Sequence, residues 1–273
     1  MNWKEVKDQS EFLELSHKVC LIDEARYSLL YGLALGCKSA YKLLSYGDSA
    51  IAIQTSKHKP LVVSDLSEEE AKKLALLIDN SSDIKEIVAT KETVNHVLDN
   101  LPHRHPGYPE MLMNQKIYTC SKVDLPSQDE KNPTKLIQAT AVHLPLVKEW
   151  FTEFMLDAYI DTTPEDKTMQ ELAETRISLG QVFLLMKDGN PVSMCCSARP
   201  TKNSITVNGV FTPIERRGEG FASYAVGLLS QSLLKDYKSC SLYTDATNPT
   251  SNKIYTNIGY APVCESLHYQ LKE

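Results

Sequence analysis

The stretch Thr212-Pro213-Ile214-Glu215-Arg216-Arg217-Gly218-Glu219-Gly220-Phe221-Ala222 decides the fold of this chain. It follows an apolar run, Ile205–Phe211, that predicts a strand, and it precedes Ser223–Leu234, whose apolar spacing predicts an amphipathic helix. The first N–H groups of a helix have no partner inside the helix, and the helix dipole adds partial positive charge there. Gly218 and Gly220 let the backbone approach a bulky group closely. This strand, turn and helix therefore predict a site for a phosphate-bearing ligand.

Three kinds of pyrophosphate-binding site are possible interpretations of this turn. A P-loop is excluded, because no Gly-Lys-Ser/Thr follows the glycines. A dinucleotide site fits loosely, because Gly218-Glu219-Gly220-Phe221-Ala222-Ser223 lies near the end of the chain, with too little sequence after it for that fold. A coenzyme A site is the third possibility, with Arg216 and Arg217 as countercharge.

The segment Arg217-x-x-Gly220-x-Ala222 resembles the (Gln/Arg)-x-x-Gly-x-(Gly/Ala) signature of the GNAT superfamily of acyl-CoA-dependent N-acyltransferases. The segment Asn248–Tyr260 resembles the second signature of that superfamily, in which Asn, a small residue, Tyr and Gly-Phe/Tyr follow one another. Ser251 stands where alanine is common, and the doubled arginine leaves the register of the anion-binding arginine open, with Arg217 favoured by its spacing to Gly220. One helix and one strand fit between the two signatures, so the chain is identified as similar to this superfamily.

The resemblance implies an α+β fold for residues 135–273, a mixed and mostly antiparallel sheet flanked by helices. The residue patterns follow the order β-α-α-β-β-β-α-β-α-β. The expected strands are 135–142, 181–186, 191–198, 204–211, 239–245 and 263–271, and the expected helices are 144–159, 168–179, 223–234 and 251–258.

Residues 1–125 are expected to form a second, smaller α/β domain, joined by a linker at 126–134 to the domain at 135–273. Helices are predicted over 8–20, 23–37, 67–79 and 91–101, with a hairpin over 40–46 and 50–55 and a strand over 84–89. Because this order echoes the second half, we predict a degenerate GNAT-like repeat that has lost coenzyme A binding. An unrelated α/β domain is the alternative.

The resemblance also implies the site. It assigns coenzyme binding to Val210, Phe211, Thr212, Arg217, Gly218, Glu219, Gly220, Phe221, Ala222, Ser223, Asn248, Asn252 and Tyr255. Tyr255 is the expected catalytic residue, a general acid toward the thiolate, because a phenol with a pKa of ~10 stays protonated at neutral pH. Packing of the helix is the alternative role for Tyr255, and helix capping is the alternative for Asn248.

No general base can be singled out from the sequence. Asp245 ends a predicted strand, Glu215 precedes the glycine turn, and Glu153 and Asp157 lie on the first helix of the second half. A water relay is equally open, because an amine needs only a weak base.

Composition narrows the function classes further. The net charge is −6 and neither half is basic, which argues against nucleic-acid binding. No run of 18 apolar residues predicts a membrane span, and the polar start Met1–Glu5 predicts no signal peptide, so a cytoplasmic protein is expected. The seven cysteines form no C-x-x-C pair, so free thiols are expected and no metal. Cys195 and Cys196 should face opposite sides of a strand, and His103-Arg104-His105 is expected to be a solvated loop.

These inferences predict transfer of an acetyl group from acetyl-CoA, as cosubstrate, to a primary amine by direct attack in a ternary complex. A small-molecule or peptide amine is the expected acceptor, and the protein is expected to be a monomer or homodimer. An acyl-CoA-binding sensor or assembly module without turnover is the alternative. Transfer of a longer acyl group is a weaker one.

Overall fold

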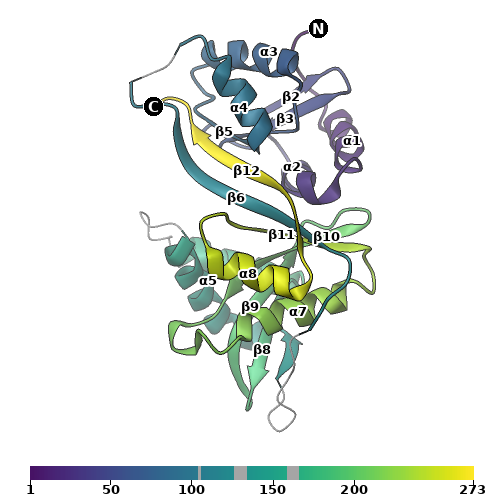
Figure 1. Cartoon of the computed structure of the whole chain (residues 1–273), viewed down its shortest axis with the longest axis vertical. Helices are drawn as coiled ribbons and strands as arrows, with labels where there is room; N and C mark the ends of the chain where they lie inside the picture. The colour runs from purple at the N-terminus through teal and green to yellow at the C-terminus, as the bar shows by residue number, and fades with distance from the viewer. Residues whose placement is uncertain (104–105, 126–133, 159–165) are drawn as a thin grey trace.

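A single mixed sheet of twelve strands runs through the computed structural model, which describes residues 1–103, 106–125, 134–158 and 166–273. The strands are β1 Lys4–Glu5, β2 Lys42–Tyr46, β3 Ala50–Gln54, β4 Leu61–Val63, β5 Glu86–Thr90, β6 Glu110–Cys120, β7 Lys135–Gln138, β8 Val182–Lys187, β9 Asn190–Ala198, β10 Ser204–Phe211, β11 Ser239–Asp245 and β12 Ala261–Gln270. The helices are α1 Gln9–Cys20, α2 Glu24–Gly36, α3 Glu68–Asp79, α4 Lys91–Asp99, α5 Leu144–Ala158, α6 Asp166–Ser178, α7 Phe221–Leu233 and α8 Pro249–Ile258. The upper lobe in Figure 1 holds α1–α4, and the lower lobe holds α5–α8.

The two halves of the chain repeat one topology. The order β1-α1-α2-β2-β3-β4-α3-β5-α4-β6 recurs as β7-α5-α6-β8-β9-β10-α7-β11-α8-β12, apart from two short 3₁₀ turns. The sheet order β1-β2-β3-β4-β5-β12-β6-β11-β10-β9-β8-β7 reads the same from either end when each strand is exchanged for its counterpart. Both halves also contain one parallel pair, β4 with β5 and β10 with β11. The predicted repeat is therefore present at the level of topology.

The last strand of each half completes the sheet of the other half. β12 lies between β5 and β6, and β6 lies between β12 and β11. Ser266 of β12 pairs with Thr90 of β5, while Tyr243 of β11 pairs with Ile117 of β6. Figure 1 shows these two long strands crossing from one lobe to the other. The smaller domain expected before residue 126 therefore shares one continuous sheet with the second half.

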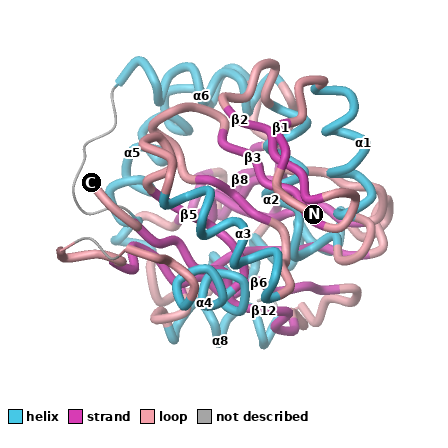
Figure 2. The backbone as a smooth tube through the Cα atoms, turned by 90° about the horizontal axis from the view of Figure 1, so that it is seen from above, coloured by secondary structure: helices cyan, strands magenta, loops and turns pink. Residues whose placement is uncertain are grey.

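Helices cover both faces of the sheet, as the view from above shows (Figure 2). In the lower lobe, α5 and α6 bury apolar residues such as Phe151 and Ala173 against one face, and α7 and α8 bury Val226 and Ile258 against the other. Cys195 belongs to the α7 side and Cys196 to the α5 side, so the predicted alternation of these thiols is confirmed. All seven cysteines are free.

The predicted strands and helices of residues 135–273 are all present, with ends that differ by a few residues. Helix α7 begins at Phe221, two residues before the predicted start at Ser223. In the first half β1, β4 and β6 were not predicted, and β4 is only three residues long. Tyr159, expected at the end of α5, lies outside the described residues, as do Arg104 and His105.

Candidate active site

The glycine turn ends in a helix start that no side chain of the described residues caps. Gly218 and Gly220 have φ of +84° and +79°, which glycine adopts without strain. A Cβ at either position would meet no other atom within 4 Å, so the space beside the turn is open. Gly220 is the N-cap of α7 and provides no side-chain hydrogen bond, and Tyr224 donates the first helical bond to the Gly220 carbonyl. The N–H groups of the first turn are therefore available to an anion.

Strands β10 and β11 separate beside this turn. Their parallel pairing covers Ser204–Thr206 with Ser239–Ser241, although the strands continue to Phe211 and Asp245. On its other edge β10 shifts register with β9 between Asn208 and Phe211, at Gly209 with φ +56°. Within the described residues, the separation leaves the edge of β10 that ends at Phe211 without a neighbouring strand on the β11 side, and an extended ligand could hydrogen-bond there.

Two residues predicted to line the coenzyme arm already have partners. The Phe211 carbonyl accepts a hydrogen bond from Ser193 Oγ at 2.9 Å, and Thr212 Oγ1 lies 2.9 Å from Ser193 Oγ. Val210 lies next to them on β10. Ser193 thus ties the end of β10 to β9, a support that the sequence analysis missed.

The arginines of the turn are paired with acidic groups. Arg217 Nε donates to the Thr212 carbonyl at 3.0 Å, and its guanidinium forms a salt bridge with Asp157 of α5. Arg216 lies 3.7 Å from Glu219, with its guanidinium 5.5 Å from the Phe221 ring. Arg217 therefore links the end of β10 to α5, and its half-exposed side chain can turn toward a ligand.

Lys187 is a further cation beside the turn that the sequence analysis missed. Its Nζ lies 5.1 Å from the centre of the Phe221 ring, over the first residue of α7. Lys187 ends β8, far from the turn in sequence, and no local motif indicated this position.

Tyr255 lies in the apolar core between α7, α8 and the sheet. Its side chain is 9% exposed, and the centre of its ring lies 6.5 Å from that of Tyr118, in a tilted arrangement, and 6.2 Å from that of Tyr260, edge to face. Burial raises the pKa of Tyr255 to about 12, and the nearby thiol of Cys195 acts in the same direction. In the described part of the chain no group hydrogen-bonds to its hydroxyl. Tyr255 is therefore protonated at neutral pH and has a proton to donate to a ligand.

Asn248 and Asn252 hold the turn from β11 into α8. Asn248 is the N-cap of α8, and its Oδ1 accepts from the Ser251 N–H at 3.0 Å. Asn252 Nδ2 donates to the Asn248 carbonyl at 2.7 Å, and Asn252 Oδ1 accepts from the Tyr118 hydroxyl at 3.0 Å. Because Tyr118 belongs to β6, the exchanged strand positions the helix that carries Tyr255. Both asparagines thus have structural partners in the described chain.

The four candidate bases differ in their surroundings. Asp245 Oδ1 accepts from the N–H and the hydroxyl of Thr247, both at 2.8 Å, and Asp157 pairs with Arg217. Glu153 is exposed, yet partial burial raises the pKa of its carboxyl, and the charges of Glu149, Glu215 and Asp157 raise it further, against the opposing charge of Arg217. Glu215 is exposed in the 3₁₀ turn before the glycines. Glu153 is therefore the candidate whose proton affinity is best raised toward that of a base.

The counterpart turn in the first half is closed to anions. Helix α3 starts with Glu68, Glu69 and Glu70, and Ser67 and Glu70 form a capping box at its N-terminus. The Glu70 carboxylate accepts from the Ser67 N–H at 2.8 Å. Three carboxylates and a filled cap disfavour phosphate at this helix start.

Within the described residues, no helix is long and apolar enough to cross a membrane, and no group of three or more potential metal ligands is assembled. No protein-family model matches the sequence, and no curated protein matches it either.

Several solved structures are similar over the whole chain. An acetyltransferase from the GNAT family of Colwellia psychrerythraea superposes with a TM-score of 0.64 at 13% identity, covering 100% of both chains. A GCN5-related N-acetyltransferase from Sphaerobacter thermophilus gives a TM-score of 0.65 at 9% identity, covering 99% of this chain and 96% of that one. A tandem GNAT protein from the clavulanic acid biosynthesis pathway gives 0.59 at 8% identity, covering 98% and 97%. These similarities, together with the repeated topology, show that the chain has the GNAT fold along its whole length, in a tandem arrangement.

Proposed function

We propose that residues 135–273, completed by β6, transfer an acetyl group from acetyl-CoA to a primary amine by direct attack in a ternary complex. One arrangement carries this proposal. The uncapped start of α7 lies beside the separated strands β10 and β11, and the protonated phenol of Tyr255 lies in the core between α7, α8 and the same sheet. An anion site, a free strand edge and a proton donor together suit a thioester whose carrier bears a pyrophosphate.

The chain offers a partner for each part of acetyl-CoA. The N–H groups from Gly218 to Ser223 would bind the pyrophosphate, with Lys187 and Arg217 as countercharge. The edge of β10 from Val210 to Thr212 would hold the pantetheine arm through backbone hydrogen bonds. Asn248 and Asn252 would act indirectly, by fixing α8 and with it Tyr255.

The reaction needs three proton transfers. The acceptor ammonium first loses a proton, to Glu153 or through water, and its nitrogen then attacks the thioester carbon. The C–S bond breaks as the C–N bond forms, and Tyr255 donates its hydroxyl proton to the sulfur. The attacking nitrogen loses its second proton, which restores Tyr255 through solvent, so the products are an amide and free coenzyme A. General acid catalysis of this kind contributes about 10²- to 10⁴-fold in rate.

A sensor that binds acyl-CoA without turnover is the alternative function. The closed helix start of the first half disfavours acyl-CoA binding there, whereas the second half has both an open turn for binding and a tyrosine for turnover. Release of free thiol from acetyl-CoA, followed across a panel of amines, separates the two functions. Amine-dependent thiol release supports the enzyme. Tight binding of acetyl-CoA with no thiol release for any amine would support the sensor instead.

A further inference from the structure

Two arginines of the second half have no acidic partner among the described residues. Arg26, Arg216 and Arg217 each form a salt bridge, whereas Arg176 and Arg199 form none with the described residues. Arg176 Nη1 is fully buried and makes no hydrogen bond with the described residues, and the guanidinium of Arg199 lies 4.7 Å from the centre of the Tyr243 ring. A buried charge without a counter-charge is costly, so this region of the fold favours an anion.

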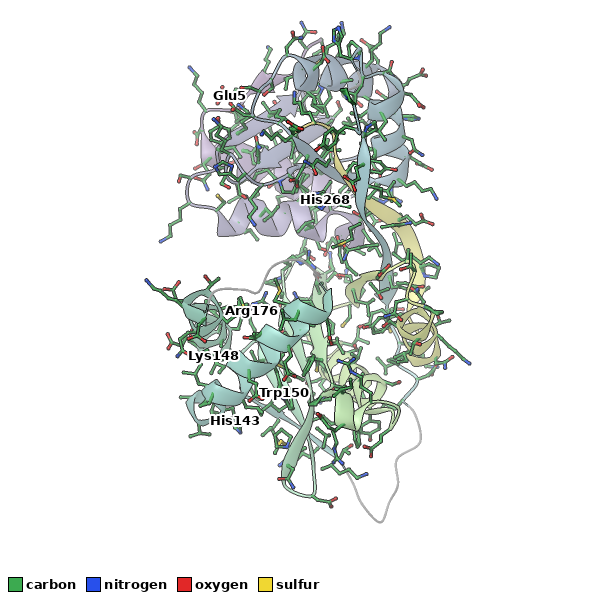
Figure 3. The ribbon with its side chains drawn as sticks, turned by 90° about the vertical axis from the view of Figure 1, so that its left-hand side faces the viewer. Glu5, His143, Lys148, Trp150, Arg176 and His268 are labelled. Atoms are coloured by element: carbon green, nitrogen blue, oxygen red, sulfur yellow. The ribbon has the colours of Figure 1, made fainter. Side chains whose placement is uncertain are left out.

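The guanidinium groups of Arg176 and Arg199 influence each other electrostatically. Burial lowers the pKa of Arg199, Tyr243 opposes that effect, and the charge of Arg176 adds to it. Arg176 also acts on the buried thiol of Cys196, against the effect of burial. Tyr243 follows Leu242, which packs on the α7 side of the sheet, so Tyr243 and the Arg199 guanidinium over its ring lie on the side to which Cys196 belongs. The charge of Arg176 acts on both Arg199 and Cys196, so Arg176 belongs to the same group. Figure 3 shows Arg176 in the part of the lower lobe that faces the upper lobe.

Asn208 adds an acceptor to this group. Its Oδ1 is fully buried and has no hydrogen-bond partner in the described chain. Asn208 pairs with Cys196 across β10 and β9, so both side chains point to the face covered by α5 and α6. Arg176, Arg199 and Asn208, named here the arginine cluster, thus present positive charge and one unfilled acceptor on a single face. Buried polar atoms rarely remain without a hydrogen-bond partner, so a ligand or a water molecule must hydrogen-bond to these atoms.

The arginine cluster lies behind the point where the strands separate. Asn208 is two residues beyond Thr206, the last residue of β10 that pairs with β11. Tyr255 and α7 lie on the opposite face of the sheet. A molecule bound at the cluster could thus reach through the separation toward a thioester held on the other side.

We propose that Arg176 and Arg199 bind the carboxylate of the acceptor and that Asn208 accepts an N–H from its amine. The acceptor would then be a small amine that also carries a carboxylate, such as an amino acid. Guanidinium groups bind carboxylates through paired, charge-assisted hydrogen bonds, and a side-chain carbonyl suits an amine N–H. This inference rests on the proposed function, since it names the substrate class of that site.

Packing between the two halves is the competing role for Arg199. A Cβ on Gly32 of α2 would lie 2.7 Å from Arg199 Cγ, and the Tyr243 hydroxyl donates to the Ala25 carbonyl at 3.2 Å. Arg199 is therefore wedged between α2 and the sheet of the second half. Arg176 comes from α6, and its buried Nη1 has no hydrogen-bond partner in the described residues, so its substitution removes charge without removing a hydrogen bond of the described chain.

The experiment compares each of the twenty protein amino acids with its amide as acceptor, by thiol release from acetyl-CoA. The unmodified protein should use at least one amino acid about tenfold or more better than the amide. Arg176→Gln should lower kcat/KM for that amino acid about 10- to 100-fold, as expected for lost hydrogen bonds to a charged group, and should leave the amide unchanged. Lys202→Gln, an exposed residue in the connection from β9 to β10, removes the same charge and should change neither.

Binding measurements keep the two proposals separate. Calorimetric titration of the preferred amino acid, or of all twenty in turn, into protein without coenzyme tests the arginine cluster directly. Acetyl-CoA binding tests the proposed function. Binding of acetyl-CoA together with acetylation of amides or simple amines as good as that of amino acids would overturn the inference. Equal amino-acid binding by the unmodified protein and Arg176→Gln would also overturn it, as would no amino-acid binding at all.

Discussion

Replacing Gly220 with alanine tests whether the turn before α7 binds the pyrophosphate. Gly220 has φ +79°, and a residue with a Cβ pays roughly 1–2 kcal/mol for this left-handed conformation. No atom lies within 4 Å of the position that the Cβ would take, so steric overlap adds nothing to the free energy of unfolding. The midpoint of thermal unfolding should therefore fall by only a few degrees.

The effect on coenzyme binding should be much larger. The new methyl group would occupy the open space where the phosphate must approach the first N–H groups of α7. Loss of one charge-assisted hydrogen bond costs about 1.5–3 kcal/mol, which weakens binding about 10- to 150-fold. Calorimetric titration of acetyl-CoA measures this directly.

Gly107→Ala is the matched control. Gly107 has φ +80° and also has no atom within 4 Å of a Cβ, but it lies in the loop before β6. The same loss of stability is expected, with unchanged coenzyme affinity. If both variants lose stability equally and both bind acetyl-CoA like the unmodified protein, the turn is not the phosphate site.

Three other perturbations follow from the same geometry. Tyr255→Phe should lower kcat about 10²- to 10⁴-fold and leave the Kd for acetyl-CoA unchanged, since the hydroxyl has no partner in the described chain whose loss would disturb the site. Steady-state rates measure kcat and calorimetric titration measures Kd. An unchanged kcat would remove the tyrosine from the mechanism. Glu153→Gln should abolish the rise of kcat/KM with pH on the acidic side, because in the unmodified protein that rise follows ionisation of a carboxyl whose pKa lies above its usual value. The raised pKa means that the folded state disfavours the charged carboxylate, so the variant should be slightly more stable at pH values above the raised pKa. An unchanged pH dependence of kcat/KM would point to a water relay. Asp157→Asn should tighten acetyl-CoA binding by freeing Arg217, with a change of at most about 1 kcal/mol in unfolding by urea because both side chains are half exposed. Weaker binding would mean that the salt bridge places the arginine for the ligand.

The glycine turn and α8 could be predicted because their signals are local. Gly218 and Gly220 adopt the positive φ that their position demanded, and Asn248 caps α8 three residues before Ser251, as a helix start requires. The GNAT fold followed from these two segments and from their spacing.

The strand exchange could not be predicted, because its signals are distant in sequence. The side chains of β6 run from exposed at Glu110 to buried at Cys120 without a clear alternation, so no periodicity marked a strand. The pairing of Ser266 with Thr90 joins residues from opposite ends of the chain. Neither segment contains a local sequence signal that predicts which strand it pairs with.

Individual side-chain contacts of the site could not be predicted from the sequence either. Arg217 was assigned to the ligand from its motif, yet in the folded chain its guanidinium pairs with Asp157. Asn252 was assigned to the coenzyme, and in the folded chain its amide bridges Tyr118 and the turn before α8. Such contacts depend on which helices and strands the fold places next to each other, and these neighbours cannot be predicted from a single sequence.

The number of acetyl-CoA molecules bound per chain tests the account most directly. The second half has an open helix start, and the first half has one closed by Ser67 and three glutamates. Calorimetric titration of acetyl-CoA should give one site per chain in the micromolar range, and Arg217→Glu should abolish it. Absence of binding, two equivalent sites, or binding that survives the charge reversal would contradict the account.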